Sequence, residues 1–478
     1  MKVYPLFGNG MAGHSYPVTR QRRVNVYFEN RPDGDKTKVA VFGTPGLTTK
    51  FTLDGVSRGV LGTESALFNV ISDTFYRLNS SGATVASATI NSFIGNVAMA
   101  NDSNQVLIVD GVNGYEFNTS TNTLTQITAA GFPNGARTCA FVSSYFVAEQ
   151  PGTQKFFVSD TFDAASWNAL SFASASAYTD NVVAVDALIG NLVIFSQRHI
   201  EFWQNVGNSP QPFAPILSAT SEYGINAIWS RAHVGSTILF LAQNPQGTSQ
   251  VCQISGYSVS VVSTPDIEDA INQFSTISDA VALSYVINGH PMYQLTFPTA
   301  NRSFLYDLST GIWSEVQSGI SVTYAQRHRG QFSTTFQNQA LITDSSSGKV
   351  FLIDQNNYTD DGTQVLREMV TRHGQQDHNV LSIAELYLDM ETGVGTNVAS
   401  GDNAATPNPV ITLEVSKDNG RTWNNPRLLQ IGAQGKYLTR VIARRFGSAR
   451  DFVFRFRMTD PVKFVVTEGA AVVSERQQ

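Results

Sequence analysis

The stretch FLYDLSTGIW, residues 304–313, combines a strand, a tight turn and a second strand that ends in an aromatic anchor. Its turn, STG at residues 309–311, supplies the position with positive φ that a short hairpin requires. Val, Ile, Thr, Phe and Tyr are frequent in the rest of the chain, and its 37 glycines, with Asn-Gly and Asp-Gly pairs, punctuate it at intervals. The composition therefore favours β structure throughout.

Hairpins of this kind recur at intervals of about 40 to 50 residues, which is the period of a four-stranded propeller blade. Blades of the kelch and sialidase type use the same strand–turn–strand device. We therefore predict an all-β fold in which residues 45–362 form a β-propeller, with about six blades favoured and seven as the alternative. The hairpins that carry this prediction pair residues 67–71 with 75–78, 105–109 with 114–117, 192–195 with 199–203, 237–241 with 250–254, 292–297 with 303–308 and 340–343 with 349–353.

Residues 363–478 alternate apolar and polar side chains over several segments separated by long turns, which predicts a C-terminal β-sandwich-like domain. Residues 1–44 are predicted to form an N-terminal arm and the first strands. The best helix candidate covers residues 266–283, with Asp266 as its N-cap and Ile267, Ile271 and Phe274 on one face. The expected sandwich strands are residues 384–389, 410–416, 437–445, 451–458 and 462–466.

Length and composition exclude several classes of protein. The 478 residues suffice for two or three domains, and a net charge of −6 argues against nucleic-acid binding over the whole surface. Cys139 and Cys252 cannot form the disulfide framework of a small secreted protein, so we expect a reduced compartment at synthesis. The first residues lack the apolar run of a signal peptide, and the longest apolar stretch is too short for a membrane helix. We therefore expect no membrane anchor.

One local motif matches its pattern in full. Residues 416–423 fit the Asp-box S-x-D-x-G-x-T-W, which is known from sialidases and from many non-enzymatic β proteins. We expect the Ser and Asp side chains to bond the turn backbone, the Gly to take a positive φ, and the Trp to pack under the hairpin. The motif lies away from the catalytic centre even in enzymes, so we predict a structural role. Its pattern residues are Ser416, Asp418, Gly420, Thr422 and Trp423.

Four other patterns match catalytic or metal-binding motifs only as bare strings. GNGMAG (8–13) resembles a dinucleotide fingerprint without its strand and helix, and GVSRG (55–59) resembles a nucleophile elbow that leads into a strand. We expect an arm and a turn, respectively. Two polar clusters lack the spacing of zinc or EF-hand ligands and are predicted to be loops, so we predict no catalytic, cofactor-binding or metal-binding residues. The clusters are His373, Asp377 and His378, and Asp354, Asn356, Asp360 and Asp361.

A cluster of arginines lies near the C-terminus. Six fall within eighteen residues, and on a strand Arg455 and Arg457 would share one face while the phenylalanines beside them take the other. The cluster is either a solvated sheet face or a contact surface for an acidic neighbouring subunit or a passing phosphate backbone. We assign Arg444, Arg445 and Arg450 to a candidate assembly interface. The six arginines are Arg440, Arg444, Arg445, Arg450, Arg455 and Arg457.

Longer strings, in a fixed order along the chain, carry a family resemblance. They are YPLFG (4–8), RVNVY (23–27), FGTPGL (42–47), SDA (278–280), GHPMYQLTFPTA (289–300), YD (306–307), TGIW (310–313), the Asp-box, RRFGSARD (444–451) and TDPVK (459–463). Together they resemble the tail hub (nozzle) proteins of short-tailed bacteriophages, also described as packaged-DNA stabilisation proteins. The resemblance spans nearly the whole chain, with one departure at residues 27–29, where YFE replaces a Tyr-Pro-Glu-like step.

The resemblance implies a non-enzymatic structural protein of the virion tail, assembled in the host cytoplasm and needing no cofactor. Such proteins are similar in forming a six-fold ring beneath the portal and adaptor rings. The implied partners are further copies in a homohexamer, the portal or adaptor ring proteins, a tail needle or plug, and tail fibres or spikes. Double-stranded DNA would be retained in the ring's channel and would pass through it without sequence-specific binding.

A glycan-binding or glycan-hydrolysing propeller is the alternative. A hydrolase predicts two carboxylates about 5 to 10 Å apart near the central axis. A binding protein predicts an exposed aromatic platform near Trp203, Trp229 or Trp313, although a tryptophan in a blade is more often part of the core.

Overall fold

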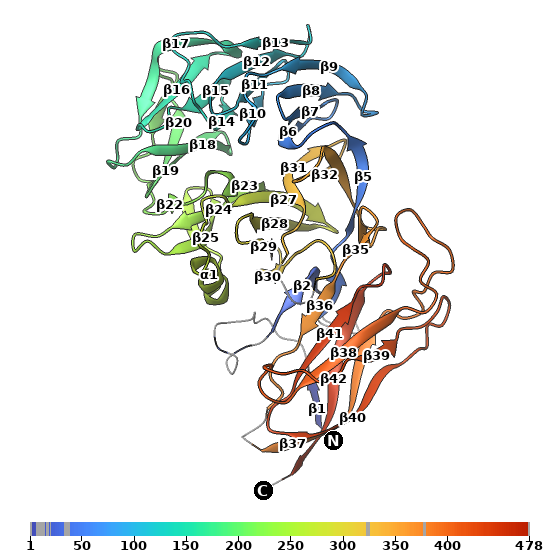
Figure 1. Cartoon of the computed structure of the whole chain (residues 1–478). Coiled ribbons are helices and arrows are strands. Elements are labelled where there is room, and N and C mark those ends of the chain that lie inside the picture. Colours follow the sequence, from blue (N-terminus) through green and yellow to red (C-terminus); the bar gives the residue numbers. More distant parts are fainter. Residues whose placement is uncertain are drawn as a thin grey trace.

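The computed structural model describes residues 2–5, 15, 19, 21–32, 39–321, 326–375 and 379–476. These residues form almost exclusively β structure, arranged as a propeller and a sandwich (Figure 1), which confirms the predicted fold class. In the described part of the chain, no helix is long and apolar enough to cross a membrane.

Within the described residues the propeller has seven blades, each an antiparallel sheet, so the favoured count of six is wrong and the alternative of seven is correct. In chain order the blades consist of β6 (Ser57–Gly62), β7 (Leu67–Ile71), β8 (Thr74–Leu78) and β9 (Thr84–Thr89); β10 (Ala98–Asn101), β11 (Gln105–Val109), β12 (Gly114–Asn118) and β13 (Thr123–Gln126); β14 (Cys139–Val142), β15 (Tyr145–Glu149), β16 (Lys155–Asp160) and β17 (Asp163–Ser174); β18 (Val182–Leu188), β19 (Asn191–Ser196), β20 (Ile200–Asn205) and β21 (Phe213–Pro215); β22 (Gly224–Ile225), β23 (Ala232–Val234), β24 (Thr237–Gln243), β25 (Ser249–Ser255) and β26 (Ser258–Val261); β27 (Val281–Ile287), β28 (His290–Phe297), β29 (Arg302–Asp307) and β30 (Ile312–Glu315); and β31 (Gly330–Phe336), β32 (Gln339–Asp344) and β33 (Lys349–Asp354) with β5 (Gly46–Thr52).

The blade that the sequence analysis missed is the third, β14 to β17. Two of its three hairpin turns contain no glycine. Instead, Ser143 and Ser144 take positive φ values of 50° and 78° in the first turn, and Phe162 takes 51° in the last. Ser and Phe seldom adopt this conformation, so these turns carry no Asn-Gly or Asp-Gly signal, and the tertiary packing of the blade holds the residues in it.

The propeller closes by pairing strands from its opposite ends. β5 pairs antiparallel with β33, so that Thr52 lies opposite Lys349 and Gly46 lies opposite Asp354. β5 also pairs in parallel with β34 (Thr359–Asp360), which pairs with β35 (Thr363–Gln364). The outer strand of the last blade therefore comes from the beginning of the propeller sequence.

Apolar side chains fill the spaces between neighbouring blades. Phe68 and Phe75 of the first blade pack with Val106 and Phe117 of the second, and all four are almost completely buried. Because both faces of its sheet are covered, β7 in the middle of the first blade is buried along its whole length and reads as a nearly continuous apolar run.

The helix that the sequence predicts is much shorter in the structure. α1 covers Pro265–Asn272, begins after Thr264 rather than at Asp266, and buries Ile267 and Ile271. It ends before the polar and β-branched run at residues 275–278, and β27 has already begun at residue 281. A 3-10 turn, η1 (Ile228–Ser230), is the other helical element of the described residues.

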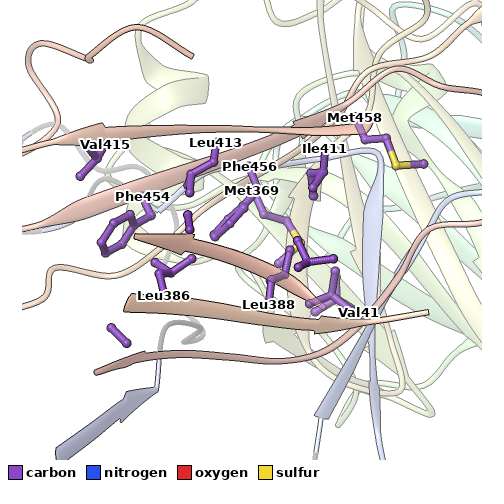
Figure 2. Close-up of a cluster of buried hydrophobic side chains, with 14 of the residues drawn as sticks. Val41, Met369, Leu386, Leu388, Ile411, Leu413, Val415, Phe454, Phe456 and Met458 are labelled. Atoms are coloured by element: carbon purple, nitrogen blue, oxygen red, sulfur yellow. The ribbon is translucent and has the colours of Figure 1, made fainter. Parts of the chain in front are cut away.

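The sandwich contains strands from both ends of the chain. Side chains of its two sheets interdigitate, with Leu386 and Leu388 facing Leu413, Phe454 and Phe456 (Figure 2). Strands β3 and β4 belong to residues 1–44, which we predicted as an N-terminal arm and the first strands. The predicted domain boundaries stay a prediction. One sheet contains β1 (Lys2–Pro5), β3 (Val26–Asn30), β4 (Val39–Gly43), β42 (Val465–Arg476), β37 (Val380–Met390) and β40 (Val441–Ala449); the other contains β2 (Arg23–Val24), β36 (Arg367–Val370), β41 (Val453–Met458), β38 (Val410–Ser416) and β39 (Arg427–Gln430).

Propeller and sandwich share one continuous sheet. β30 of the sixth blade pairs in parallel with β2, which pairs antiparallel with β36, which in turn pairs antiparallel with β41. These four strands lead from the propeller into the sandwich in Figure 1, and we call them the interdomain joint. The buried side chain of Asn25 donates to the carbonyls of Gln317 and Leu366, which ties the end of β2 to both domains.

Candidate functional site

The Asp-box forms the loop between β38 and β39. The hydroxyl of Ser416 accepts the N–H of Gly420 at 2.9 Å and donates to the carboxylate of Asp418 at 2.6 Å. Asp418 also accepts the N–H groups of Arg421 at 3.1 Å and Thr422 at 2.9 Å, and the Thr422 hydroxyl at 2.5 Å. Gly420 has a φ of 82°, at which a side chain would strain the backbone.

These donors stabilise the charged form of Asp418. The hydroxyls of Ser416 and Thr422 contribute most, and together with the backbone donors they lower the pKa of Asp418 to about 2. Trp423 is half-buried, and the guanidinium of Arg455 lies 4.0 Å from the centre of its ring. The Asp-box loop is thus connected to the arginines of β41 through its tryptophan.

Arg440 is exposed just before β40, and the other five arginines of the cluster form two groups, of which the first lies on the outer face of β41. Arg455 and Arg457 are half-buried there, while the phenylalanines beside them point into the core, as the strand pattern predicts. Arg455 donates to Glu414 at 2.6 Å. Arg457 donates to Glu414 at 3.0 Å and to Glu368 at 2.6 Å.

Ion pairs continue from this face across the interdomain joint. Arg22 contacts Glu368 at 3.3 Å and Glu315 at 3.0 Å, and Arg302 reaches Glu315 at 3.1 Å. Cations and anions therefore alternate from the sixth blade to the sandwich, and we call this row the charged ladder. Its members are Arg302, Glu315, Arg22, Glu368, Arg457, Glu414 and Arg455.

Arg22 is the ladder residue whose charged form is most clearly stabilised by its neighbours. Burial opposes the charged form of Arg22, but the charge and hydrogen bond of Glu315, and then those of Glu368, outweigh it and raise the pKa of Arg22. The neighbouring Arg23 lies over the ring of Phe28, and burial lowers the pKa of Arg23 to about 10. The sequence analysis missed this ladder, because Arg22 and Glu315 are 293 residues apart in the sequence.

The second group contains the three arginines of the candidate assembly interface. Arg444 and Arg445 lie on β40, an edge strand of its sheet within the described residues, and Arg450 follows that strand; all three are exposed. Arg444 pairs with Glu385 at 2.7 Å, and Arg445 has a positive φ of 65° at an irregularity of the strand pairing. The structure therefore places the three arginines at one edge of the sandwich, away from the charged ladder.

A surface loop that the sequence analysis did not single out lies between the first two blades. Arg58 is 6% exposed and donates to carbonyls of Ser72, Ser92, Ile94 and Gly95 at 2.7 to 2.8 Å. These hydrogen bonds fix the loop in a conformation that leaves the side chains of Phe93 and Ile94 in solvent, with exposed fractions of 70% and 85%. Arg58 belongs to the GVSRG string (55–59), which the sequence analysis compared with a nucleophile elbow because of its serine. Ser57 itself is buried at the start of β6 and donates to Asn69.

The remaining predicted clusters have separate partners. His373 bonds Asp451 at 2.6 Å, while Asp377, His378 and the GNGMAG string lie outside the described residues. Of the calcium-like run, Asp360 accepts a bond from Ser318, whereas Asp361 accepts one from Lys349. In the part of the chain that the structure describes, no three His, Cys, Asp or Glu side chains converge as metal ligands.

The tryptophans named for a glycan platform are mostly interior. Trp203 and Trp313 are buried, and their indole N–H groups donate to Glu201 and to the carbonyl of Val262. Trp229 is half-buried. The tryptophans of the blades therefore act mainly as core residues.

Fold and surface together define a two-domain β-propeller–sandwich protein whose charged residues join its domains. Two family models match the chain: residues 15–358 match "Bacteriophage P22 Gp10, beta-propeller", and residues 366–474 match "Bacteriophage P22 Gp10, beta-sandwich". The chain belongs to this family. The tail hub protein gp10 of Salmonella phage P22 is 21% identical over an alignment of 434 residues, and the match covers 87% of this chain and 87% of that protein. Family membership identifies the chain as a phage tail protein.

Solved structures show more distant similarities. A chain of the mitotic checkpoint complex is 10% identical with a TM-score of 0.41, over 68% of this chain and 98% of that one. The Pan2 WD40 domain of Neurospora crassa is 10% identical with a TM-score of 0.42, over 65% and 96%. The designed Ika8 protein is 12% identical with a TM-score of 0.40, over 64% and 99%.

Proposed function

We propose that this chain is the subunit of the tail hub, or nozzle, of a short-tailed phage, and that it acts as a non-enzymatic structural protein. The observation that carries the proposal is the order of the two family matches, propeller then sandwich, which together span residues 15–474. The relative matched over 87% of each chain is named a tail hub protein. The proposed assembly is a homohexameric ring that extends the portal channel, retains packaged DNA and connects to a tail needle or fibres.

The rigidity of the subunit supports this role. A ring that holds DNA under pressure needs subunits whose domains keep a fixed relative orientation. In this chain the domains share backbone hydrogen bonds through β30, β2, β36 and β41, and the charged ladder lies across the same strands. The closed propeller also leaves few free strand edges for unwanted pairing between subunits.

The charge of the chain supports passage of DNA rather than tight binding. Its net charge is −6, so a channel lined by such subunits would hold the polyanion by enclosure instead of by attraction. We propose that contacts between subunits use local positive charge at the edge of the sandwich, where Arg444, Arg445 and Arg450 are exposed. An arginine at an interface can pair with a carboxylate of the neighbouring copy through two parallel bonds.

Electron microscopy of the purified full chain, alone and with portal and adaptor rings, tests the proposed function. We expect six-fold rings with an open lumen, and we expect the rings to bind the portal–adaptor complex. A chain that stays monomeric both alone and with those rings would refute the hub assignment.

A triple variant tests the interface. Replacing Arg444, Arg445 and Arg450 with alanine should abolish ring formation and leave the folded monomer intact in circular dichroism. A control with three other exposed cations removed, K50A/R421A/K436A, should assemble as the wild type does. Equal assembly of both triple variants would remove the proposed role of these arginines.

A further inference from the structure

A small cavity lies where the propeller meets the sandwich, and its volume is about 70 Å³. Ile287 and Asn288 of the β27–β28 turn line it from the propeller, and Phe42, Gly43 and residues 463–465 line it from the sandwich. Arg367 of β36 and Tyr358 complete the wall between the two domains. A space of this size holds about five water molecules, or one small anion with fewer waters.

Arg367 lines the cavity with a cation that the protein pairs incompletely. The residue is 1% exposed, and its Nη2 donates to the carbonyls of Tyr358 at 3.3 Å and Thr44 at 3.5 Å. Its Nε and Nη1 have no hydrogen-bond acceptor among the described residues. A buried guanidinium with unused donors is costly unless an anion or ordered water binds them.

The backbone beside Arg367 accommodates this side chain specifically. A Cβ atom on Gly43 would lie 2.5 Å from the Nε of Arg367, so only glycine leaves room for the guanidinium at the cavity wall. Burial lowers the pKa of Arg367 to about 10, with Asp360 opposing that shift, so the group stays charged at neutral pH. Asp360 itself bonds Ser318 and lines a different cavity.

The other lining residues favour an anion. Lys463 adds a second cation, and Tyr27, Asn288, Gln355 and Tyr358 add polar side chains, while no lining residue among those described carries a carboxylate. Lys463 pairs with Glu391 at 2.8 Å outside the cavity, but its side chain is half exposed and can turn inward.

We propose that this cavity binds one phosphate-type oxyanion, held by the guanidinium of Arg367 and the ammonium of Lys463. The anion compensates the incompletely paired charge of Arg367 and connects β36 and the sandwich to the β27–β28 turn of the propeller. The bound anion therefore stabilises one relative orientation of the two domains. This proposal is independent of ring formation, since all of its groups lie within one chain.

The test uses the full chain in a buffer without phosphate, at constant ionic strength. We expect isothermal titration with inorganic phosphate to show one site per chain, and phosphate to raise the melting temperature more than chloride does. Lys463→Met should weaken phosphate binding about tenfold, because it removes one charged hydrogen bond. The control Lys436→Met, at an exposed lysine of another loop, should bind phosphate as the wild type does.

Arg367→Met separates an anion site from a purely structural arginine. Without phosphate this variant should be at least as stable as the wild type, because it removes an incompletely paired buried charge. With phosphate the order should reverse, since only the wild type gains stability. If Arg367→Met fails to fold, the comparison of Lys463→Met with Lys436→Met decides. Absence of phosphate binding by the wild type, or equal binding by the two lysine variants, would overturn the proposal and leave water as the ligand of Arg367.

Discussion

Glu368 is the residue whose change tests most directly whether the charged ladder holds the two domains together. Its side chain is 1% exposed and accepts hydrogen bonds from Arg457 at 2.6 Å and from Arg22 at 3.3 Å. The substitution Glu368→Gln keeps the size of the side chain but removes its charge, and it turns an amide N–H group toward one of the two guanidinium groups. Both arginines then lose their shared carboxylate at the interdomain joint.

The expected cost follows from the geometry of the two bonds. Breaking a fully buried ion pair costs about 3–5 kcal/mol, and a hydrogen bond to a charged group contributes about 1.5–3 kcal/mol. The arginine side chains are 16% and 23% exposed, and the longer bond is weak, so the full value does not apply. We expect Glu368→Gln to lower the free energy of unfolding by about 2–3 kcal/mol.

Urea denaturation followed by circular dichroism and by tryptophan fluorescence measures this loss, provided that the two transitions coincide. Hydrogen exchange should also accelerate in β36 and β41. The control is Glu391→Gln, which removes an exposed pair with Lys463 and should cost under about 1 kcal/mol. If Glu368→Gln costs no more than the control, the ladder does not stabilise the joint and the reasoning is wrong.

Three further predictions concern other parts of the chain. Arg58→Met should expose residues 91–97 to limited proteolysis and lower stability by about 3 kcal/mol, because four carbonyls lose a buried donor; unchanged cleavage would contradict this. Burial raises the pKa of Asp360 to about 6, although Ser318 and the nearby arginines oppose this shift, so the stability that Asp360 contributes falls as the pH rises from about 4 to about 6. Burial lowers the pKa of His328 to about 4, and the charges of Arg327 and Arg329 add to this shift, so the stability that His328 contributes grows as the pH rises from about 4 to about 6.5. These two pH dependences oppose each other. Between about pH 4 and pH 6 the melting temperature should therefore rise with pH in Asp360→Asn, which keeps His328, and fall with pH in His328→Gln, which keeps Asp360. The same pH dependence in both variants would refute these two pKa shifts. Asp418→Asn should accelerate hydrogen exchange in residues 416–424 without shifting the midpoint of global unfolding. Because the pKa of Asp418 is about 2, the wild-type loop should keep its protection from hydrogen exchange down to pH 3.

Local sequence signals located most hairpins closely, because glycine and asparagine turns mark where strands must end. The strand predicted at residues 105–109 coincides with β11, and that at 410–416 coincides with β38. The same reasoning missed the third blade, although it located the hairpins at residues 67–78 and 192–203, whose turns lack glycine and asparagine as well. It also failed at residues 437–445, where β40 begins at Val441, because residues 436–439 form a turn closed by the Thr439 hydroxyl and the Lys436 carbonyl.

The interdomain joint could not be predicted by any local pattern. Arg22 lies in the segment predicted as an N-terminal arm and the first strands, and nothing near it in sequence indicates that Glu315 and Glu368 will be its neighbours. Such contacts depend on strand pairing over hundreds of residues, for which a single sequence carries no signal. The same holds for the cavity at Arg367, whose lining residues come from five separate parts of the chain.

The topology couples the folding of both domains to the two ends of the chain. β5 completes the seventh blade only after β33 has formed, and β4 pairs with β42, whose sequence is more than 400 residues away. Pairings of such sequence separation form late, because the entropy of closing a long loop is lost before the contacts compensate for it. The propeller therefore cannot close before residue 354 is present, and the sandwich cannot complete its sheet before β42 is present. For the proposed ring assembly this order would be favourable, since a chain that ends before β41 lacks the interdomain joint.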